Sequence, residues 1–227
     1  MTQIELNVSK IHNGKISFWK FMFSLLIIAL HLGMYSNGEK YIFSSGSIAV
    51  DFFFLVSGFL FAKKAINYKK ISKSEVGFET RKILLKKISY FIKYLLMLWI
   101  FAFPFLLLIK KYNINDFING IFNILYFPIN GLKVDNILGI SWYIVAMLIY
   151  DLIFFLYLIK YRKNFIYLYS PIIIFFLGTY ISKKYGMIAG PWAVDTFAFK
   201  GVLRAIFDMN IGFVLYVLCD EISKINF

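Results

Sequence analysis

The stretch FWKFMFSLLIIALHLGMY, Phe18–Tyr35, decides the fold class of this chain. Its length is about the ~18 residues that a helix needs to cross a bilayer. It contains a lysine, Lys20, and a histidine, His31. Their separation of eleven residues makes three helical turns plus ~20°, with a rise of ~16 Å, so both lie on one helix face. A titratable group in hydrocarbon is costly, and this pair is a functional-site hypothesis.

The composition extends this conclusion to the whole chain. Of 227 residues, 60% are hydrophobic and 21% aromatic, and the mean hydropathy is +0.72. Soluble globular domains contain only ~45–50% apolar residues, so we expect a multi-spanning membrane protein. The single cysteine, Cys219, excludes a disulfide framework and a cysteine-built metal site. We predict no metal ligands.

We expect an all-α fold, a polytopic transmembrane helix bundle with about six spans. Residues 1–17 are expected to form a cytoplasmic N-terminal arm and residues 18–227 a transmembrane domain. Two apolar stretches interrupted by Asn, Gly, Pro or Asp, Ile114–Ile129 and Gly186–Phe199, are predicted to be short interfacial or re-entrant segments. The six predicted spans are Phe18–Tyr35, Ile42–Ala62, Ile88–Ile109, Ile140–Ile159, Phe165–Ile181 and Val202–Cys219.

The net charge of +13 is concentrated in one region. Ten Lys or Arg residues stand between Lys63 and Lys93, against the two acids Glu75 and Glu79. Between two apolar spans such a cluster predicts a cytoplasmic loop, over residues 63–87, rather than a nucleic-acid site. The simplest topology places both termini in the cytoplasm. We expect a plasma (inner) membrane protein with the lipid bilayer as its first partner and no nucleic-acid partner.

Three residues in the first two spans could carry chemistry. His31 could be a general base, since neutral imidazole accepts a proton, or could hold two helices together by a hydrogen bond. Lys20 could bind a phosphate or extend to the membrane surface. Asp51 shares a small, polar helix face with Ser47 and Gly58, which would let another helix approach closely. It could pair with a cation, orient His31, or stabilise a helix start.

Further candidates lie later in the chain. Asp151 stands in the middle of the fourth span, where it could relay protons, pair with a buried cation or simply be protonated and hydrogen-bonded. Trp142 begins the same span and is explained by an aromatic belt at the membrane interface. A basic cluster directly before the third span could anchor the topology, touch anionic lipid or bind an anionic cofactor such as coenzyme A. Its members are Arg81, Lys82, Lys86 and Lys87.

In this order, the motifs resemble the membrane acyltransferase family 3. The resemblance covers about residues 15–215, and its most specific part is SIAVDFFFLVSGFL over residues 47–60, which includes Asp51 and Ser57. The other matching features are Lys20 with His31, the basic cluster, SWY at residues 141–143 with Trp142, and RAIFDMNIG, which begins at Arg204.

The resemblance implies transfer of an acyl group, usually acetyl, from cytoplasmic acyl-CoA to a hydroxyl of a cell-surface or lipid-linked glycan. It implies His31 as the base, Lys20 near the donor, and Arg81, Lys82, Lys86 and Lys87 on the coenzyme A phosphates. No bound cofactor is expected; acyl-CoA (acetyl-CoA) is a substrate.

The chain departs from the family pattern in three ways. Lys20 replaces an arginine and lacks its bidentate fork, the basic residues lack the Arg-x-x-Arg spacing, and the chain has fewer helices than the family's usual ten. We therefore expect the family's C-terminal helices to be missing. An inactive truncated remnant or an assembly partner is the alternative function. A small proton-coupled transporter using His31, Asp51 and Asp151 is a further alternative.

Overall fold

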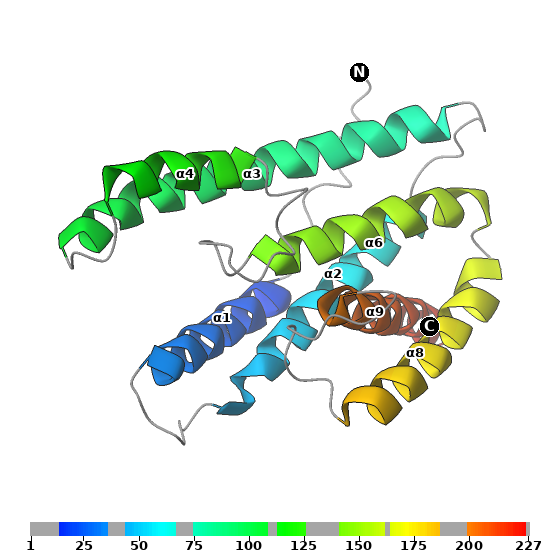
Figure 1. Cartoon of the computed structure of the whole chain (residues 1–227). Coiled ribbons are helices and arrows are strands. Elements are labelled where there is room, and N and C mark those ends of the chain that lie inside the picture. The colour runs from blue at the N-terminus through cyan, green and yellow to red at the C-terminus, as the bar shows by residue number, and fades with distance from the viewer. Residues whose placement is uncertain are drawn as a thin grey trace.

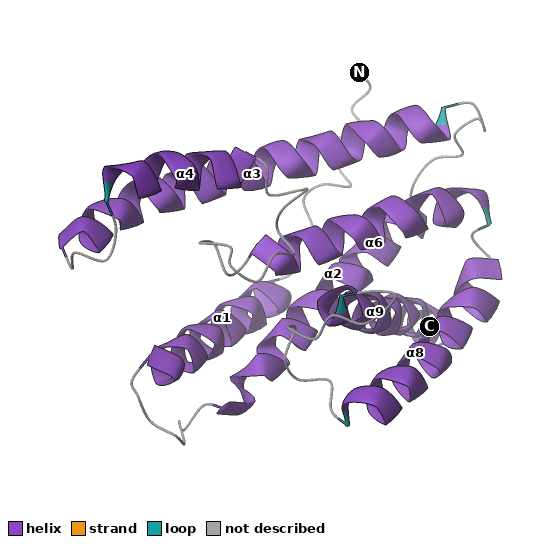
Figure 2. Ribbon diagram, in the orientation of Figure 1, coloured by secondary structure: helices purple, strands orange, loops and turns teal. Residues whose placement is uncertain are grey.

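The computed structural model of the protein describes residues 14–35, 44–66, 75–108, 113–125, 141–161, 164–186 and 199–225. Every secondary-structure element in these ranges is helical (Figures 1 and 2), which confirms the predicted all-α bundle. Residues 187–198 of the predicted segment Gly186–Phe199, and most of the N-terminal arm, lie outside the described residues. Within the arm, residues 14–17 already belong to the first helix.

Within the described ranges, four helices are long and apolar enough to cross a membrane. They are α1 (Gly14–Tyr35), α3 (Val76–Leu108), α8 (Ser170–Tyr185), which continues a π-helical turn η3 (Phe165–Tyr169), and α9 (Lys200–Ile225).

The other two predicted spans also form helices, α2 (Ile48–Ile66) and α6 (Ser141–Lys160). Helix α2 carries three charged residues within its 19 positions, and α6 carries Asp151 in the middle of an otherwise apolar and aromatic sequence that ends at Lys160. Asp51 of α2 and Asp151 of α6 each form an ion pair with a cation of a neighbouring helix.

Helix α3 corrects the expectation of a basic loop over residues 63–87. Its 33 residues correspond to about 50 Å, well beyond the ~30 Å of the hydrocarbon core. The helix begins at Val76, twelve residues before the predicted span, because the segment 79–87 is rich in Glu, Arg, Lys and Leu, which favour a helix. The basic cluster is therefore displayed on a rigid helical extension.

Helices α2 and α9 cross at the centre of the bundle (Figure 1), in backbone contact at two glycines. A Cβ added at Gly58 would meet the backbone of Met209, and one added at Gly212 would meet the backbone of Leu55, both well inside 3.0 Å. Small residues allow this close approach. The predicted stripe of Ser47, Asp51 and Gly58 is the face that receives α9.

Aromatic side chains fill the space between α2, α6 and α9. Phe54 of α2 contacts the rings of Trp142 and Tyr143, with centroids 6.0 and 4.5 Å away. Phe61, farther along α2, makes edge contacts with Tyr150 and Phe155 of α6. These contacts fix the spacing of α2 and α6, the two helices that position the site described below.

Helix α4 (Ile114–Leu125) packs against α3 and corresponds to the first predicted interfacial segment. Gly120 lies against the Trp99 indole, whose Nε1 donates a hydrogen bond to the Phe117 carbonyl over 3.1 Å. At only 12 residues, the helix spans ~18 Å and is too short to cross the hydrocarbon core.

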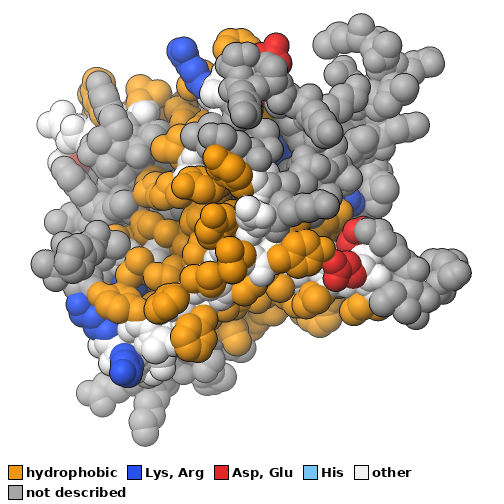
Figure 3. Space-filling model, turned by 90° about the vertical axis from the view of Figure 1, so that its right-hand side faces the viewer, with side chains coloured by type: hydrophobic (Ala, Val, Ile, Leu, Met, Phe, Trp, Pro, Cys, Tyr) orange, Lys and Arg blue, Asp and Glu red, His pale blue; other side chains and the backbone are white. Residues whose placement is uncertain are grey.

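Helix α1 lies at the edge of the bundle (Figure 1) and packs on α2 and on the 3₁₀ turn η2 (Ser44–Ser47). The rings of Phe23 and Phe52 stack with centroids 4.0 Å apart. Viewed from the side of α8, the surface carries a broad apolar band with charged side chains at its margins (Figure 3). Exposed phenylalanines of α8, Phe175 and Phe176, are suited to lipid contact.

Candidate functional site

A cavity of about 490 Å³ lies between α2, α3 and α6. Its wall is built at helical spacing, since side chains three or four positions apart share one helix face. On α6 these are Met147, Asp151 and Phe155. The α2 and α3 walls consist of Ser57, Leu60, Phe61, Lys64, Thr80, Ile83, Leu84, Lys86, Lys87, Tyr90 and Phe91.

Positive charge gathers at one end of this cavity. Lys64 stands near the end of α2, and Lys86 and Lys87 lie on the helical extension of α3. Removal of part of its side chain from water lowers the pKa of Lys64, and the nearby Lys87 and Lys86 cations lower this pKa further, whereas Asp151 raises it. Three lysines against one aspartate favour an anionic ligand.

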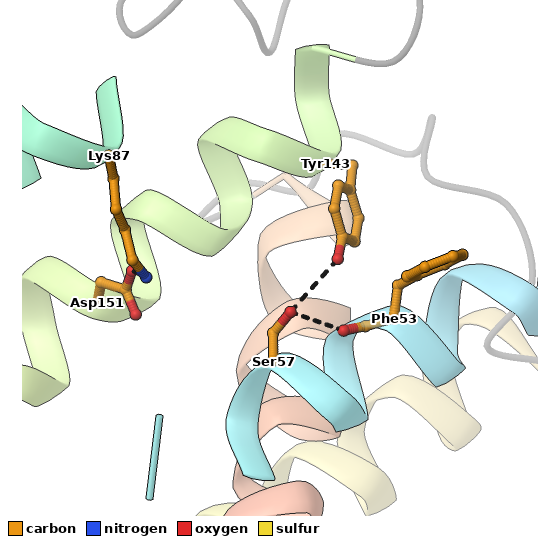
Figure 4. Close-up of polar contacts among 5 residues, drawn as sticks. All are labelled: Phe53, Ser57, Lys87, Tyr143 and Asp151. Atoms are coloured by element: carbon orange, nitrogen blue, oxygen red, sulfur yellow. Dashed lines mark hydrogen bonds and ion pairs between the residues drawn. The ribbon is translucent and has the colours of Figure 1, made fainter. Parts of the chain in front are cut away.

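Asp151 and Lys87 form an ion pair across the cavity wall (Figure 4). The Asp151 carboxylate is buried, with 3% of its side chain exposed, and its Oδ2 accepts the bond from the Lys87 ammonium. Its other oxygen, Oδ1, has no hydrogen-bond partner among the described residues. Of the roles considered for Asp151, the structure shows pairing with a cation.

Two hydroxyl groups meet deeper along α2 (Figure 4). Ser57 lies seven residues before Lys64, which is about 10 Å along the helix. Its hydroxyl donates a hydrogen bond to the Phe53 carbonyl over 2.7 Å and lies 3.5 Å from the Tyr143 hydroxyl. The lysine side chains and the Ser57 hydroxyl thus lie at different levels of one cavity, and the Tyr143 hydroxyl lies behind Ser57.

A second polar cluster lies where α2 meets α9. Asp51 forms an ion pair with Arg204, whose side chain is only 1% exposed, and Arg204 also donates a 2.8 Å hydrogen bond to the Ser47 carbonyl. Asp208 lies beside Asp51 in the same cluster, and its side chain is buried. Sequence reasoning missed Asp208, although its position four residues after Arg204 places both on one helix face.

The remaining predicted site residues are not part of the cavity. His31 is exposed on α1, and Lys20 is half-buried on the same helix. Arg81 and Lys82 are exposed on α3, where Lys82 lies 3.9 Å from Glu79. The structure therefore separates Lys86 and Lys87, which line the cavity, from Arg81 and Lys82, which do not.

Trp142 requires a correction. It was expected in an aromatic belt at the membrane interface, but it is buried and packs against Phe54, Phe199 and the backbone of Gly201. Its ring fills the core between α2, α6 and α9, which is a structural contact. As for metals, the described ranges contain no cluster of three or more His, Cys, Asp or Glu residues suited to holding an ion.

Comparison with known proteins identifies a family. The sequence model of a family described as "Acyltransferase domain" matches residues 13–223, which include every element that lines the cavity. No curated protein and no solved structure shows significant similarity to the chain.

Proposed function

The chain belongs to the membrane acyltransferase family 3, and from that premise we propose that it transfers an acetyl group from acetyl-CoA to a hydroxyl of a cell-surface or lipid-linked glycan. In the transfer, the hydroxyl oxygen attacks the thioester carbonyl carbon. A C–O bond forms, the C–S bond breaks, and the hydroxyl proton ends on the thiol of released coenzyme A.

The observation that carries this proposal is the arrangement of charge along the cavity. Lys64, Lys86 and Lys87 provide ammonium groups for the phosphates of the donor at one end. From there the cavity continues between apolar side chains to the Ser57 hydroxyl. A ligand with phosphates at one end and an uncharged acyl arm fits this polarity.

His31 is the proposed base that takes the proton from the acceptor hydroxyl. Its exposure on α1, at the edge of the bundle, supports an acceptor that approaches through the bilayer, as a lipid-linked glycan would. In the proposed topology both termini and the lysine-rich end of α3 face the cytoplasm, where acyl-CoA is available. We propose the plasma (inner) membrane as the location.

Binding of acetyl-CoA to the purified protein in lipid nanodiscs tests the donor site. The double variant Lys64→Gln/Lys86→Gln should weaken binding at least tenfold, because each charge-assisted hydrogen bond contributes ~1.5–3 kcal/mol. The matched control is Arg81→Gln/Lys82→Gln, which removes the same charge from side chains outside the cavity. Equal losses in both variants would contradict the assignment of the donor to this cavity.

The role of His31 is tested separately by O-acetylation of surface glycans in cells that carry His31→Ala. We expect acetylation to be lost while acetyl-CoA binding to the purified variant stays unchanged. Unchanged acetylation would refute His31 as the base.

A further inference from the structure

The buried carboxylate of Asp151 has an acceptor oxygen that no described residue uses. Its Oδ2 bonds Lys87, but its Oδ1 has no partner in the described part of the chain, although the side chain is only 3% exposed. A buried polar atom without a hydrogen bond is destabilising, and such atoms are rare in native structures. Because Asp151 lines the cavity, a ligand can supply the missing donor.

The neighbours of Asp151 define where along the ligand this donor would lie. Met147 and Phe155, one helical turn away on either side of Asp151, are apolar. Lys64 and Lys86 stand toward one end of the cavity and Ser57 toward the other. Asp151 is thus a polar point in a mostly apolar wall, between the expected phosphate end and the expected acyl end.

A carboxylate at this point disfavours further negative charge but favours an N–H or O–H group. In acyl-CoA, the pantetheine arm between the phosphates and the thioester carries two amide N–H groups and one hydroxyl group. We propose that Asp151 Oδ1 accepts a hydrogen bond from this arm and so selects amide-bearing donors. This inference rests on the proposed acetyl-CoA site.

The alternative is that Asp151 acts only by holding Lys87 in place for the phosphates. The two roles predict opposite effects of Asp151→Asn on the affinity for a phosphate ligand. If Asp151 only positions Lys87, the variant weakens phosphate ligands and leaves a phosphate-free arm unaffected. If Asp151 contacts the arm, the variant weakens binding of the arm, while loss of a negative charge beside the lysines strengthens binding of a phosphate ligand.

The experiment is competition against acetyl-CoA bound to the full chain in nanodiscs, with pantetheine as the phosphate-free probe and ADP as the phosphate probe. For Asp151→Asn we expect pantetheine to compete about tenfold more weakly, the usual loss for a hydrogen bond to a charged group, and ADP to compete equally or more strongly. Weaker competition by both probes, or unchanged competition by pantetheine, would overturn the inference.

Lys87→Gln is the second variant. The uncharged amide of the new glutamine can still donate a hydrogen bond to Asp151 Oδ2. We expect weaker competition by ADP and unchanged competition by pantetheine. A parallel loss for both probes would overturn the arm contact. If the wild-type protein fails to bind acetyl-CoA at all, the proposed function falls together with this inference, and that result is distinct from a failure confined to Asp151.

Discussion

The crossing of α2 and α9 makes a sharp prediction for Gly58→Ala. The three nearest atoms to an added Cβ are the carbonyl oxygen, carbonyl carbon and Cα of Met209, all backbone atoms. No side-chain rotation can relieve this overlap, so the two helices must move apart. Overpacking of this kind costs about 3 kcal/mol at the upper end of its usual range.

Part of that loss is offset, because alanine favours a helix over glycine by up to ~1 kcal/mol. The net destabilisation is then about 2 kcal/mol. For a chain of this size, it corresponds to a fall in melting temperature of roughly 4–8 °C at ~2–4 °C per kcal/mol. The assay is thermal unfolding in detergent micelles, followed by intrinsic tryptophan fluorescence.

Gly77→Ala is the matched control, because nothing lies within 4 Å of a Cβ added at Gly77 on α3. It should leave the melting temperature unchanged or raise it. The double variant Gly58→Ala/Gly212→Ala should lose less than the sum of its single variants, since the first separation of the helices already makes room for the second methyl group. Equal melting temperatures for Gly58→Ala and Gly77→Ala would refute the backbone contact.

Two further predictions concern charge. Asp51→Leu removes the carboxylate paired with the buried Arg204 and should lower the free energy of unfolding by about 3–5 kcal/mol. Glu79→Ala, at the exposed pair with Lys82, should change the free energy of unfolding by less than ~0.5 kcal/mol. Chemical denaturation measures both variants, and similar losses of stability would contradict the difference in burial. Acetyl-CoA affinity should fall as pH rises through the lowered pKa of Lys64, because only the ammonium form of Lys64 attracts phosphate. In Lys64→Arg, the affinity measured by titration calorimetry should depend less on pH. The same pH dependence in the variant and the wild type would argue against Lys64 as a phosphate contact.

The sequence predicted the features of the fold that depend on local pattern. Hydropathy and length identify the membrane helices, and the spacing of Ser47, Asp51 and Gly58 identifies a face suited to close helix contact. The predicted start of the third helix was wrong, because charged residues mark where a membrane span ends but do not end a helix. Lys and Arg favour helix, so α3 extends beyond the membrane span, back to Val76.

The site was less accessible from sequence because its contacts join distant positions. Asp51 and Arg204 are 153 residues apart, and Lys87 and Asp151 are 64 apart. Each acid was recognised as a candidate for pairing with a cation, but no local pattern names the partner. For the same reason, the basic cluster could not be divided into residues that face the cavity and residues that do not.

The glycine crossing also bears on how the cavity can accommodate a ligand. One wall, α2, rests backbone to backbone on α9, and any sideways step of that helix meets steep repulsion. The opposite wall, α3, leans on α6 through side chains such as Leu95 and Trp99, packed with Ile144 and Leu148, which can exchange rotamers. We therefore expect α2 to form the fixed wall of the cavity. Helix α3, together with α4, would shift to fit the thickness of the bound ligand.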